Sequence, residues 1–320
     1  MQALSSTRTR DDRFVEIVEV GTRDGLQSER TLVPAARKIE LLDSVIESGI
    51  RDIEVTSFVS PKAVPQLADA EEVIDGIARR DDTYLMALVP NLRGAERARR
   101  TSLDGGVLLC SASETHNRKN VNRSIDASLE SFPAVAAMLK EGDIDILGAV
   151  ATAFGCPFEG EVAFESVLRV ARVYADLGAR RITLGDTTGM ATPSNVRSLV
   201  RGLRAELPGV EIVLHLHNTR GVGLANVMVG LDEGVRRFDA AVGGLGGCPF
   251  AAGATGNICT EDLVYLLHES GYETGVDLAK SIGLAERMEV VLGKRLVGQV
   301  MRAGPRLKLH AASDVPTAAG

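Results

Sequence analysis

The segment RITLGDTTGMATPSNVRSLVRGLRAELPGVEIVLHLH, residues 181–217, contains one complete unit of the fold. Its two ends, Arg181–Asp186 and Glu211–His217, are short and rich in Ile, Leu and Val, which is typical of buried strands. Between them, Ser194–Leu207 has apolar residues at the i, i+3, i+4 spacing of a helix, and Pro193 stands at its start. The segment therefore predicts a strand–helix–strand unit whose two strands run parallel.

The same alternation extends along most of the chain, with a spacing of roughly 30 residues per unit. Further strands are predicted at Phe14–Val20, Asp52–Phe58, Thr83–Val89, Gly106–Cys110, Asp145–Thr152 and Arg237–Val242. Further helices are predicted at Ala35–Glu47, Glu71–Arg79, Leu129–Lys140 (with Pro133 at or near its start), Val162–Leu177, Leu224–Gly234 and about Thr260–Ser270. Eight units, without a Gly-x-Gly-x-x-Gly turn after the first strand, favour a closed (β/α)8 TIM barrel over an open dinucleotide-binding sheet.

The chain is expected to form one α/β domain over 14–305, because no linker or low-complexity segment divides it. Leu278–Leu296 continues the helical pattern beyond the eighth unit and predicts an extra C-terminal helical segment. Residues 1–13 are expected to be a frayed or disordered tail, and 306–320 a flexible one.

Composition argues against several classes of protein. A formal net charge of −7 argues against a nucleic-acid binder, which needs a basic face to neutralise phosphates. The sequence has no apolar run near the ~20 residues of a membrane span. Four cysteines without paired spacings are typical of reduced thiols in a cytoplasmic protein.

The chemistry of such barrels is found at the carboxyl ends of the strands, where the seventh predicted strand ends in His215-Leu216-His217. Because strand side chains alternate, the two imidazoles face the same side. This spacing favours a metal site over a pair of buried core histidines. Oxygen ligands beside the imidazoles would move the choice of metal toward Mg, Mn or Co.

Charged residues also stand at or near the ends of other predicted strands. Asp24 could be a carboxylate ligand and Arg23 could hold an anionic oxygen, although an Arg–Asp ion pair closing a turn explains this motif equally well. Glu54 lies inside the second predicted strand, where burial would require a partner, and Arg23 is the nearest candidate. Asp186, at the end of the sixth strand, could orient a ligand or a catalytic group.

A glycine-dense loop, GGLGGCPF at 243–250, follows the eighth predicted strand. Such a loop can close over a site, and Cys248 in it could be a general acid/base or nucleophile instead of an inert buried thiol. Asn257, in GATGN, offers an amide oxygen to a hard metal, or it belongs to a simple turn. Packing in the core is the favoured interpretation of the other cysteines, Cys110, Cys156 and Cys259.

Taken together, these segments resemble the 3-hydroxy-3-methylglutaryl-CoA (HMG-CoA) lyase family, within the metal-dependent barrel lyases and Claisen condensing enzymes. The matching stretches are VEVGTRDGLQSE (18–29), IEVTSFVSPKAVPQ (53–66), SASETHNRKN (111–120), FGCPFEG (154–160), LGDTTG (184–189), HLHNTRG (215–221) and GGLGGCPFAAGATGNICTEDLVY (243–265).

The resemblance implies retro-aldol (retro-Claisen) cleavage of HMG-CoA to acetyl-CoA and acetoacetate. It also implies a homodimer, an acyl-CoA substrate and a place in leucine degradation. It implies that Mg or Mn is held by Asp24, His215, His217 and Asn257. The implied catalytic roles are enolate stabilisation by Arg23, proton transfer by the Cys248 thiol, proton handling by His215 or Asp24, and support of the site by Glu54 and Asp186.

Two departures from the family pattern leave the substrate open. Asn218-Thr219-Arg220-Gly221 replaces the Asp-Thr-Tyr-Gly of animal-type enzymes, and Val55 replaces a Thr. A lyase for an analogue such as citramalyl-CoA is therefore the alternative. A condensing acyltransferase fits less well, because such enzymes usually carry a long C-terminal regulatory domain. A non-catalytic binding barrel fits least, because the ligand set and the thiol are both present.

Overall fold

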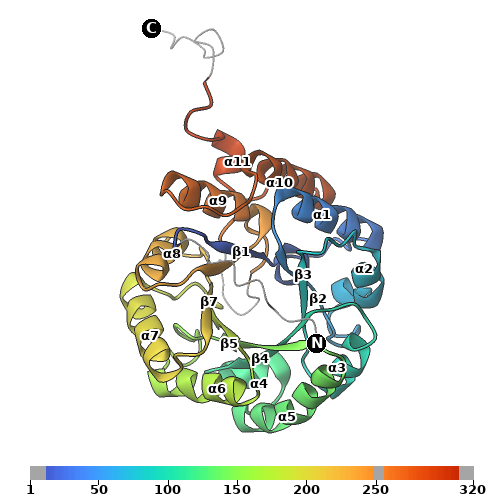
Figure 1. Cartoon of the computed structure of the whole chain (residues 1–320), viewed down its shortest axis with the longest axis vertical. Coiled ribbons are helices and arrows are strands. Elements are labelled where there is room, and N and C mark those ends of the chain that lie inside the picture. The colour runs from blue at the N-terminus through green and yellow to red at the C-terminus, as the bar shows by residue number, and fades with distance from the viewer. Residues whose placement is uncertain (1–11, 248–255, 310–320) are drawn as a thin grey trace.

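The computed structural model describes residues 12–247 and 256–309. Its eight parallel strands close into a barrel in chain order, which confirms the predicted fold (Figure 1). The strands are β1 (Glu16–Glu19), β2 (Asp52–Ser57), β3 (Tyr84–Leu88), β4 (Gly105–Ser111), β5 (Asp145–Ala151), β6 (Arg181–Gly185), β7 (Glu211–His215) and β8 (Arg237–Ala240).

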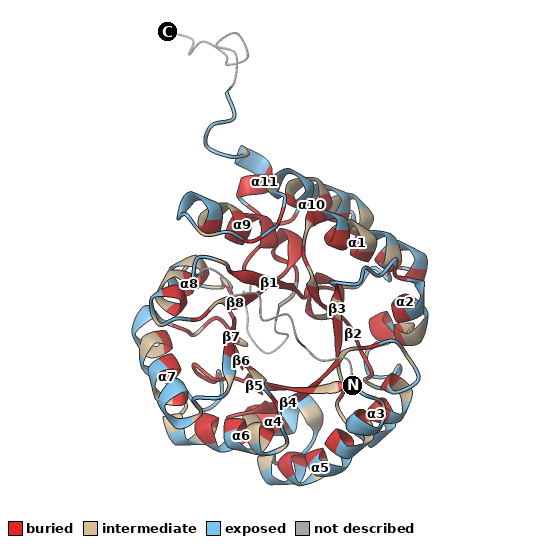
Figure 2. Cartoon of the chain, in the orientation of Figure 1, coloured by how far each residue is buried: buried red, intermediate tan, exposed pale blue. Residues whose placement is uncertain are grey.

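Helices surround the barrel and turn their apolar sides toward the strands, as the buried inner surfaces in Figure 2 show. The helices are α1 (Ala35–Ser48), α2 (Ala70–Gly76), α3 (Leu92–Ala98), α4 (Glu114–Val121), α5 (Ile125–Glu141), α6 (Phe164–Asp176), α7 (Pro193–Glu206), α8 (Gly223–Asp232), α9 (Thr260–Glu269), α10 (Leu278–Leu292) and α11 (Val300–Ala303). Three shorter turns are η1 (Gly21–Gly25), η2 (Pro65–Leu67) and η3 (Val242–Gly244).

Helix α5 corrects one expectation from the sequence. Pro133 lies inside this helix and not at its start. The helix begins at Ile125 because the Ser124 side chain accepts a hydrogen bond from Ala127 N. A proline inside a helix removes one backbone hydrogen bond, and the buried face of α5, which includes Leu129 and Phe132, packs on the barrel and offsets that loss.

The predicted extra C-terminal segment is present as α10, which packs against α1, α9 and η3, followed by α11. Helix α10 ends at Leu292 and not at Leu296, because Gly293 adopts the left-handed conformation (φ 63°) that stops a helix. The chain then runs back along η3, where Val297 N donates to the Gly243 carbonyl (3.3 Å). This segment therefore supports the start of the glycine-dense loop.

An ion network closes the barrel at the amino ends of its strands. Arg237 pairs with Asp52 and Glu211, and Arg181 pairs with Asp52 at 3.1 Å. The Arg181 guanidinium also lies over the Tyr84 ring, 4.8 Å from its centroid. These residues form the floor of the barrel, opposite the strand ends that carry the predicted site.

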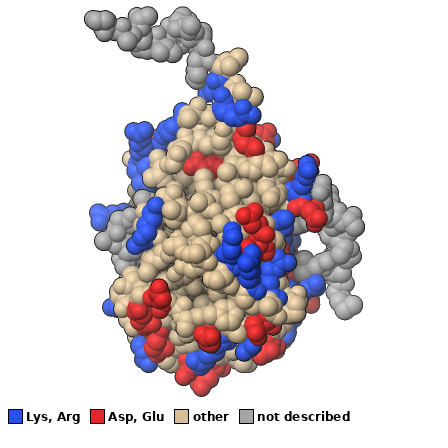
Figure 3. All heavy atoms as spheres, turned by 90° about the vertical axis from the view of Figure 1, so that its left-hand side faces the viewer, with Lys and Arg blue, Asp and Glu red and all other residues tan. Residues whose placement is uncertain are grey.

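On the face shown in Figure 3, acidic and basic side chains are interspersed with uncharged ones. The described part of the chain contains no helix that is long and apolar enough to cross a membrane.

At the start of the barrel, Phe14 pairs with Glu273 and the Arg13 carbonyl accepts from Glu273 N (2.9 Å). The domain limits of 14 and 305 stay predictions.

Candidate metal centre

Two imidazoles meet at the carboxyl end of β7. The Nε2 atoms of His215 and His217 are 3.2 Å apart, and both side chains are buried. Leu216, between them, points into the surrounding core, as strand alternation requires. The prediction that both imidazoles face the same side is confirmed.

Asp24 reaches the same point from the turn η1, which follows β1. The amides of Arg23, Asp24 and Gly25 all donate to the Val20 carbonyl, at 2.8–3.2 Å, and this wraps the chain into a single tight turn. Asp24 Oδ2 is 3.9 Å from His215 Nε2. Asp24, His215 and His217 thus offer ligand atoms that all lie within 4.8 Å of one another.

Asn257 joins this cluster through a short pairing between 216–218 and 256–258. Asn218 N donates to the Gly256 carbonyl (2.9 Å), and Ile258 N donates to the Leu216 carbonyl (3.1 Å). Asn257 Nδ2 then donates to Asp24 Oδ2 at 2.7 Å. Its Oδ1 is buried and has no hydrogen-bond partner among the residues that the structure describes. An unpaired buried amide oxygen suits a hard cation.

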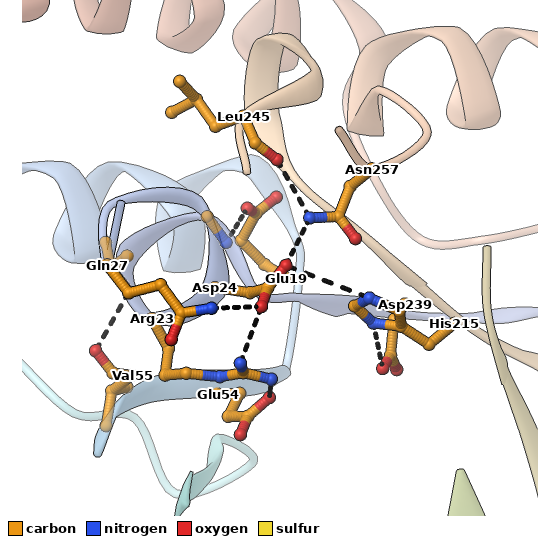
Figure 4. A network of polar contacts seen from close by, with 12 residues as sticks. Glu19, Arg23, Asp24, Gln27, Glu54, Val55, His215, Asp239, Leu245 and Asn257 are labelled. Carbon is orange, nitrogen blue, oxygen red and sulfur yellow. Dashed lines mark hydrogen bonds and ion pairs between the residues drawn. The ribbon is translucent and has the colours of Figure 1, made fainter. Parts of the chain in front are cut away.

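Arg23 links the turn to β2, as expected from the sequence. Its Nη1 donates to Asp24 (2.7 Å) and its Nη2 donates to Glu54 (2.6 Å), so the guanidinium lies between the two acids (Figure 4). Asp239 adds a third carboxylate, 3.1 Å from His215 Nδ1. When ionised, three buried carboxylates against one guanidinium leave two negative charges in excess, which fits a divalent cation.

The protonation states at the cluster also suit a metal. Burial would raise the pKa of Asp24, but Arg23 and the two histidines outweigh burial, and the pKa is lowered to about 2. Burial and the neighbouring His215 lower the pKa of His217 to about 4. Burial would likewise lower the pKa of His215, but Asp239 and Asp24 raise it. Near neutral pH, an ionised Asp24 and a neutral His217 are in the forms that bind metals.

Of the two remaining predicted site residues, the structure describes Asp186 but not Cys248. Asp186 Oδ1 accepts from Met190 N (2.6 Å) and Ala191 N (2.9 Å), which shapes the loop before α7. Its Oδ2 is buried and, among the described residues, has no partner, and burial raises the pKa of Asp186 to about 6. Cys248 lies outside the described residues. Its neighbour Gly247 lines the same cavity as the histidines.

That cavity has a volume of about 890 Å³, within the range of pockets that hold organic ligands. Its lining includes Arg23, Asp24, Glu54, His215 and His217. It extends past the cluster toward the loops before α3 and around α4, where it is lined by Asn91, Asn120, Arg123 and Phe132.

Sequence reasoning missed two partners of the cluster. Asp239 is an acidic residue inside a predicted strand, and the argument applied to Glu54 would have identified it. Gln27, whose Nε2 donates to Asp24 Oδ1 (2.8 Å), carries no comparable signal.

Arg220, one of the departures from the family pattern, donates to the carbonyls of Thr188 (3.1 Å) and Gly189 (2.6 Å) and so ties two loops together.

Fold and site together define a (β/α)8 barrel with a candidate divalent-metal centre at the mouth. Residues 14–288 match the family model described as HMGL-like. The chain is 42% identical over 300 residues to the hydroxymethylglutaryl-CoA lyase of Pseudomonas mevalonii, covering 94% of this chain and 99% of that protein. This chain therefore belongs to the HMGL-like family.

Solved structures agree with this assignment. An HMG-CoA lyase from Acinetobacter baumannii, in complex with coenzyme A and 3-methylmalate, has a TM-score of 0.91 and 44% identity, covering 96% of this chain and 99% of that one. The HMG-CoA lyase of Bacillus subtilis has a TM-score of 0.88 and 40% identity, covering 91% and 98%.

Proposed function

We propose that this protein is a divalent-metal-dependent carbon–carbon lyase that cleaves HMG-CoA to acetyl-CoA and acetoacetate. The observation that carries the proposal is the cluster of Asp24, His215 and His217, within 4.8 Å, at the mouth of an HMGL-like barrel. Relatives named as HMG-CoA lyases, at about 42% identity over most of the chain, support the substrate.

The cation would be Mg or Mn, because both accept the mixture of carboxylate, amide and imidazole ligands that the site offers. Asp24, His215, His217 and Asn257 Oδ1 would hold it. When bound, a divalent cation polarises the substrate's oxygens and lowers the pKa of its 3-hydroxyl.

Proton removal from the 3-hydroxyl starts the cleavage, and two residues are candidates for it. Asp24 is a weak base, because its pKa is about 2. The pKa of His215 is raised by Asp239 and Asp24, which makes His215 the stronger base of the two in the metal-free protein. The same Nε2 lone pair cannot hold the cation and accept this proton at once, so His215 would act as the base only when it does not bind the metal.

Arg23 would stabilise the thioester enolate that forms when the carbon–carbon bond breaks. Glu54 and Asp24 hold its guanidinium at the cavity wall, and its buried Nε has no hydrogen-bond partner in the described structure. A fixed cationic donor aimed at a developing negative oxygen lowers the barrier by about 3 kcal/mol. Cys248, which follows the cavity-lining Gly247, would then protonate the carbanion carbon.

The direct test is an assay of acetyl-CoA release from HMG-CoA, with and without a chelator, and with citramalyl-CoA as a second substrate. We expect turnover of HMG-CoA that a chelator removes and that Mg²⁺ or Mn²⁺ restores. A higher kcat/KM for citramalyl-CoA would favour the alternative lyase. Release of acetyl-CoA from neither thioester would refute the proposal.

A thiol variant tests the second half of the reaction. Cys248→Ala should lose most turnover while keeping the metal content of the wild type. Unchanged turnover would remove the thiol from the reaction.

A cytoplasmic location, a homodimer and a role in leucine degradation complete the proposal. The three described cysteines are free and buried, which suits a reducing compartment. Light scattering of the purified protein tests the dimer, and growth of a deletion strain on leucine tests the role in leucine degradation.

A further inference from the structure

The two histidines of the candidate metal centre are held differently. In the pairing of β7 with β8, His215 stands directly opposite Asp239. His215 Nδ1 and Asp239 Oδ2 are 3.1 Å apart, and both side chains are buried. By contrast, His217 Nδ1 is buried and meets no hydrogen-bond partner in the described part of the chain.

The contact with Asp239 determines which nitrogen of His215 carries the proton. A neutral imidazole has one N–H, and an ionised carboxylate can only accept a hydrogen bond. Nδ1 must therefore carry the proton and donate it to Asp239. Nε2, which faces His217 Nε2 (3.2 Å) and Asp24 Oδ2 (3.9 Å), keeps its lone pair. That lone pair points at the place where the three ligand atoms converge.

Strand pairing makes this arrangement rigid. Asp239 is fixed by a barrel strand and not by a loop, and its neighbours in β8 are buried. The sheet register therefore aligns the carboxylate with the ring.

We propose that Asp239 is a positioning residue that fixes the tautomer and the ring orientation of His215, and so sets the affinity for the divalent cation. The inference rests on the proposed function only in its use of the same metal centre. Loss of a carboxylate that orients a metal-binding histidine typically weakens metal binding about 10- to 100-fold.

Titration of purified, metal-free protein with Mn²⁺ tests this without substrate. Asp239→Ala should raise the Kd for Mn²⁺ about 10- to 100-fold. Asp239→Asn, whose amide oxygen can still accept from Nδ1–H, should raise it less. The matched control is Asp145→Asn, which removes a barrel carboxylate that bonds the Tyr84 hydroxyl far from the histidines, and which should leave the Kd unchanged.

Nitrogen NMR of the histidines provides a measurement that a merely structural role would not change. For the neutral imidazole of His215, we expect the Nδ1–H tautomer in the wild type and a mixture of tautomers in Asp239→Ala. An unchanged Kd in Asp239→Ala, or an unchanged tautomer, overturns the proposal. Weaker Mn²⁺ binding by Asp239→Ala supports the positioning role of Asp239 even if HMG-CoA is not a substrate. A failure of the proposed function can therefore be told apart from a failure of this inference.

Discussion

Arg23 depends on two buried acids, and this makes it sensitive to a conservative change. Its planar guanidinium donates to Asp24 and Glu54 at once, which a lysine ammonium cannot do with the same geometry. We expect Arg23→Lys to lower kcat about 100-fold or more, with little change in KM, because the lost interaction forms with the enolate. Steady-state kinetics at saturating metal measure this, and a kcat equal to that of the wild type would contradict the assigned role.

The buried carboxyl group of Glu261 is expected to make the stability of the protein depend on pH. Glu261 is buried in α9, where its Oε2 accepts from Gly243 N (3.0 Å), and burial raises its pKa to about 8 from the ordinary value of 4.5 for a glutamate. Between these values the folded protein keeps a proton that the unfolded chain has released. The contribution of Glu261 to stability is therefore largest below about pH 4.5 and is lost as the pH rises through about 8, by on the order of a few kcal/mol.

Glu261→Gln should remove this dependence, because glutamine keeps the acceptor for Gly243 N and does not titrate. Thermal unfolding from about pH 5 to pH 9 should show a smaller fall in Tm for the variant than for the wild type. Parallel curves for the two proteins would show that Glu261 is ionised in the folded state.

Strand periodicity predicted the positions of some individual site residues. The alternation rule placed His215 and His217 on one side, and the cost of burying a lone charge paired Glu54 with Arg23. The same cost applies to Asp239, but its partner His215 becomes apparent only from the register of β7 and β8. The contact of Asn257 with Asp24 joins residues 233 positions apart, and no local pattern encodes it.

The start of the glycine-dense loop packs against two candidate metal ligands, Asp24 and Asn257. Gly246 has φ +102°, and a Cβ there would lie 2.5 Å from Asn257 Nδ2 and 3.0 Å from Asp24 Oδ2. The Leu245 carbonyl also accepts from Asn257 Nδ2 (2.9 Å). The loop and two candidate ligands therefore share one packing arrangement.

Gly246→Ala should consequently displace Asn257 and weaken Mn²⁺ binding by about tenfold or more. Calorimetric titration measures the Kd, with Gly209→Ala as the control, because a Cβ at Gly209 meets nothing within 4 Å. Equal affinities in the two variants would mean that the loop and the metal centre are independent.

Helices were less predictable than strands, and α4 shows why. Its sequence, ETHNRKNV, has no apolar stripe, so periodicity does not predict it. Its ends are fixed locally: the Ser113 side chain accepts from His116 N, and Asn122 is left-handed at φ 54°. Each of the eight strands, by contrast, was predicted to within about three residues, because buried runs of Val, Ile and Leu mark them directly.

In the molecule as a whole, the candidate metal centre and the ion network of the floor lie at opposite ends of the barrel. Asp52 in the floor pairs with both Arg237 and Arg181. Asp52→Asn leaves these guanidinium groups with one carboxylate fewer in a buried site, and we expect a loss of roughly 3–5 kcal/mol in the free energy of unfolding. Urea unfolding measures this loss. Mn²⁺ affinity should stay that of the wild type, and a comparable loss of metal binding would contradict the separation of the two ends.

Closure of the barrel places the first strand beside the last and so brings Asp24 to His215 and His217 at the carboxyl end of β7. The most direct measurement of this centre is an anomalous difference map from crystals grown with Mn²⁺. We predict one peak at roughly 2.0–2.3 Å from oxygen or nitrogen atoms of Asp24, His215 and His217. A fully occupied ion elsewhere, with no density between these three side chains, would contradict the account.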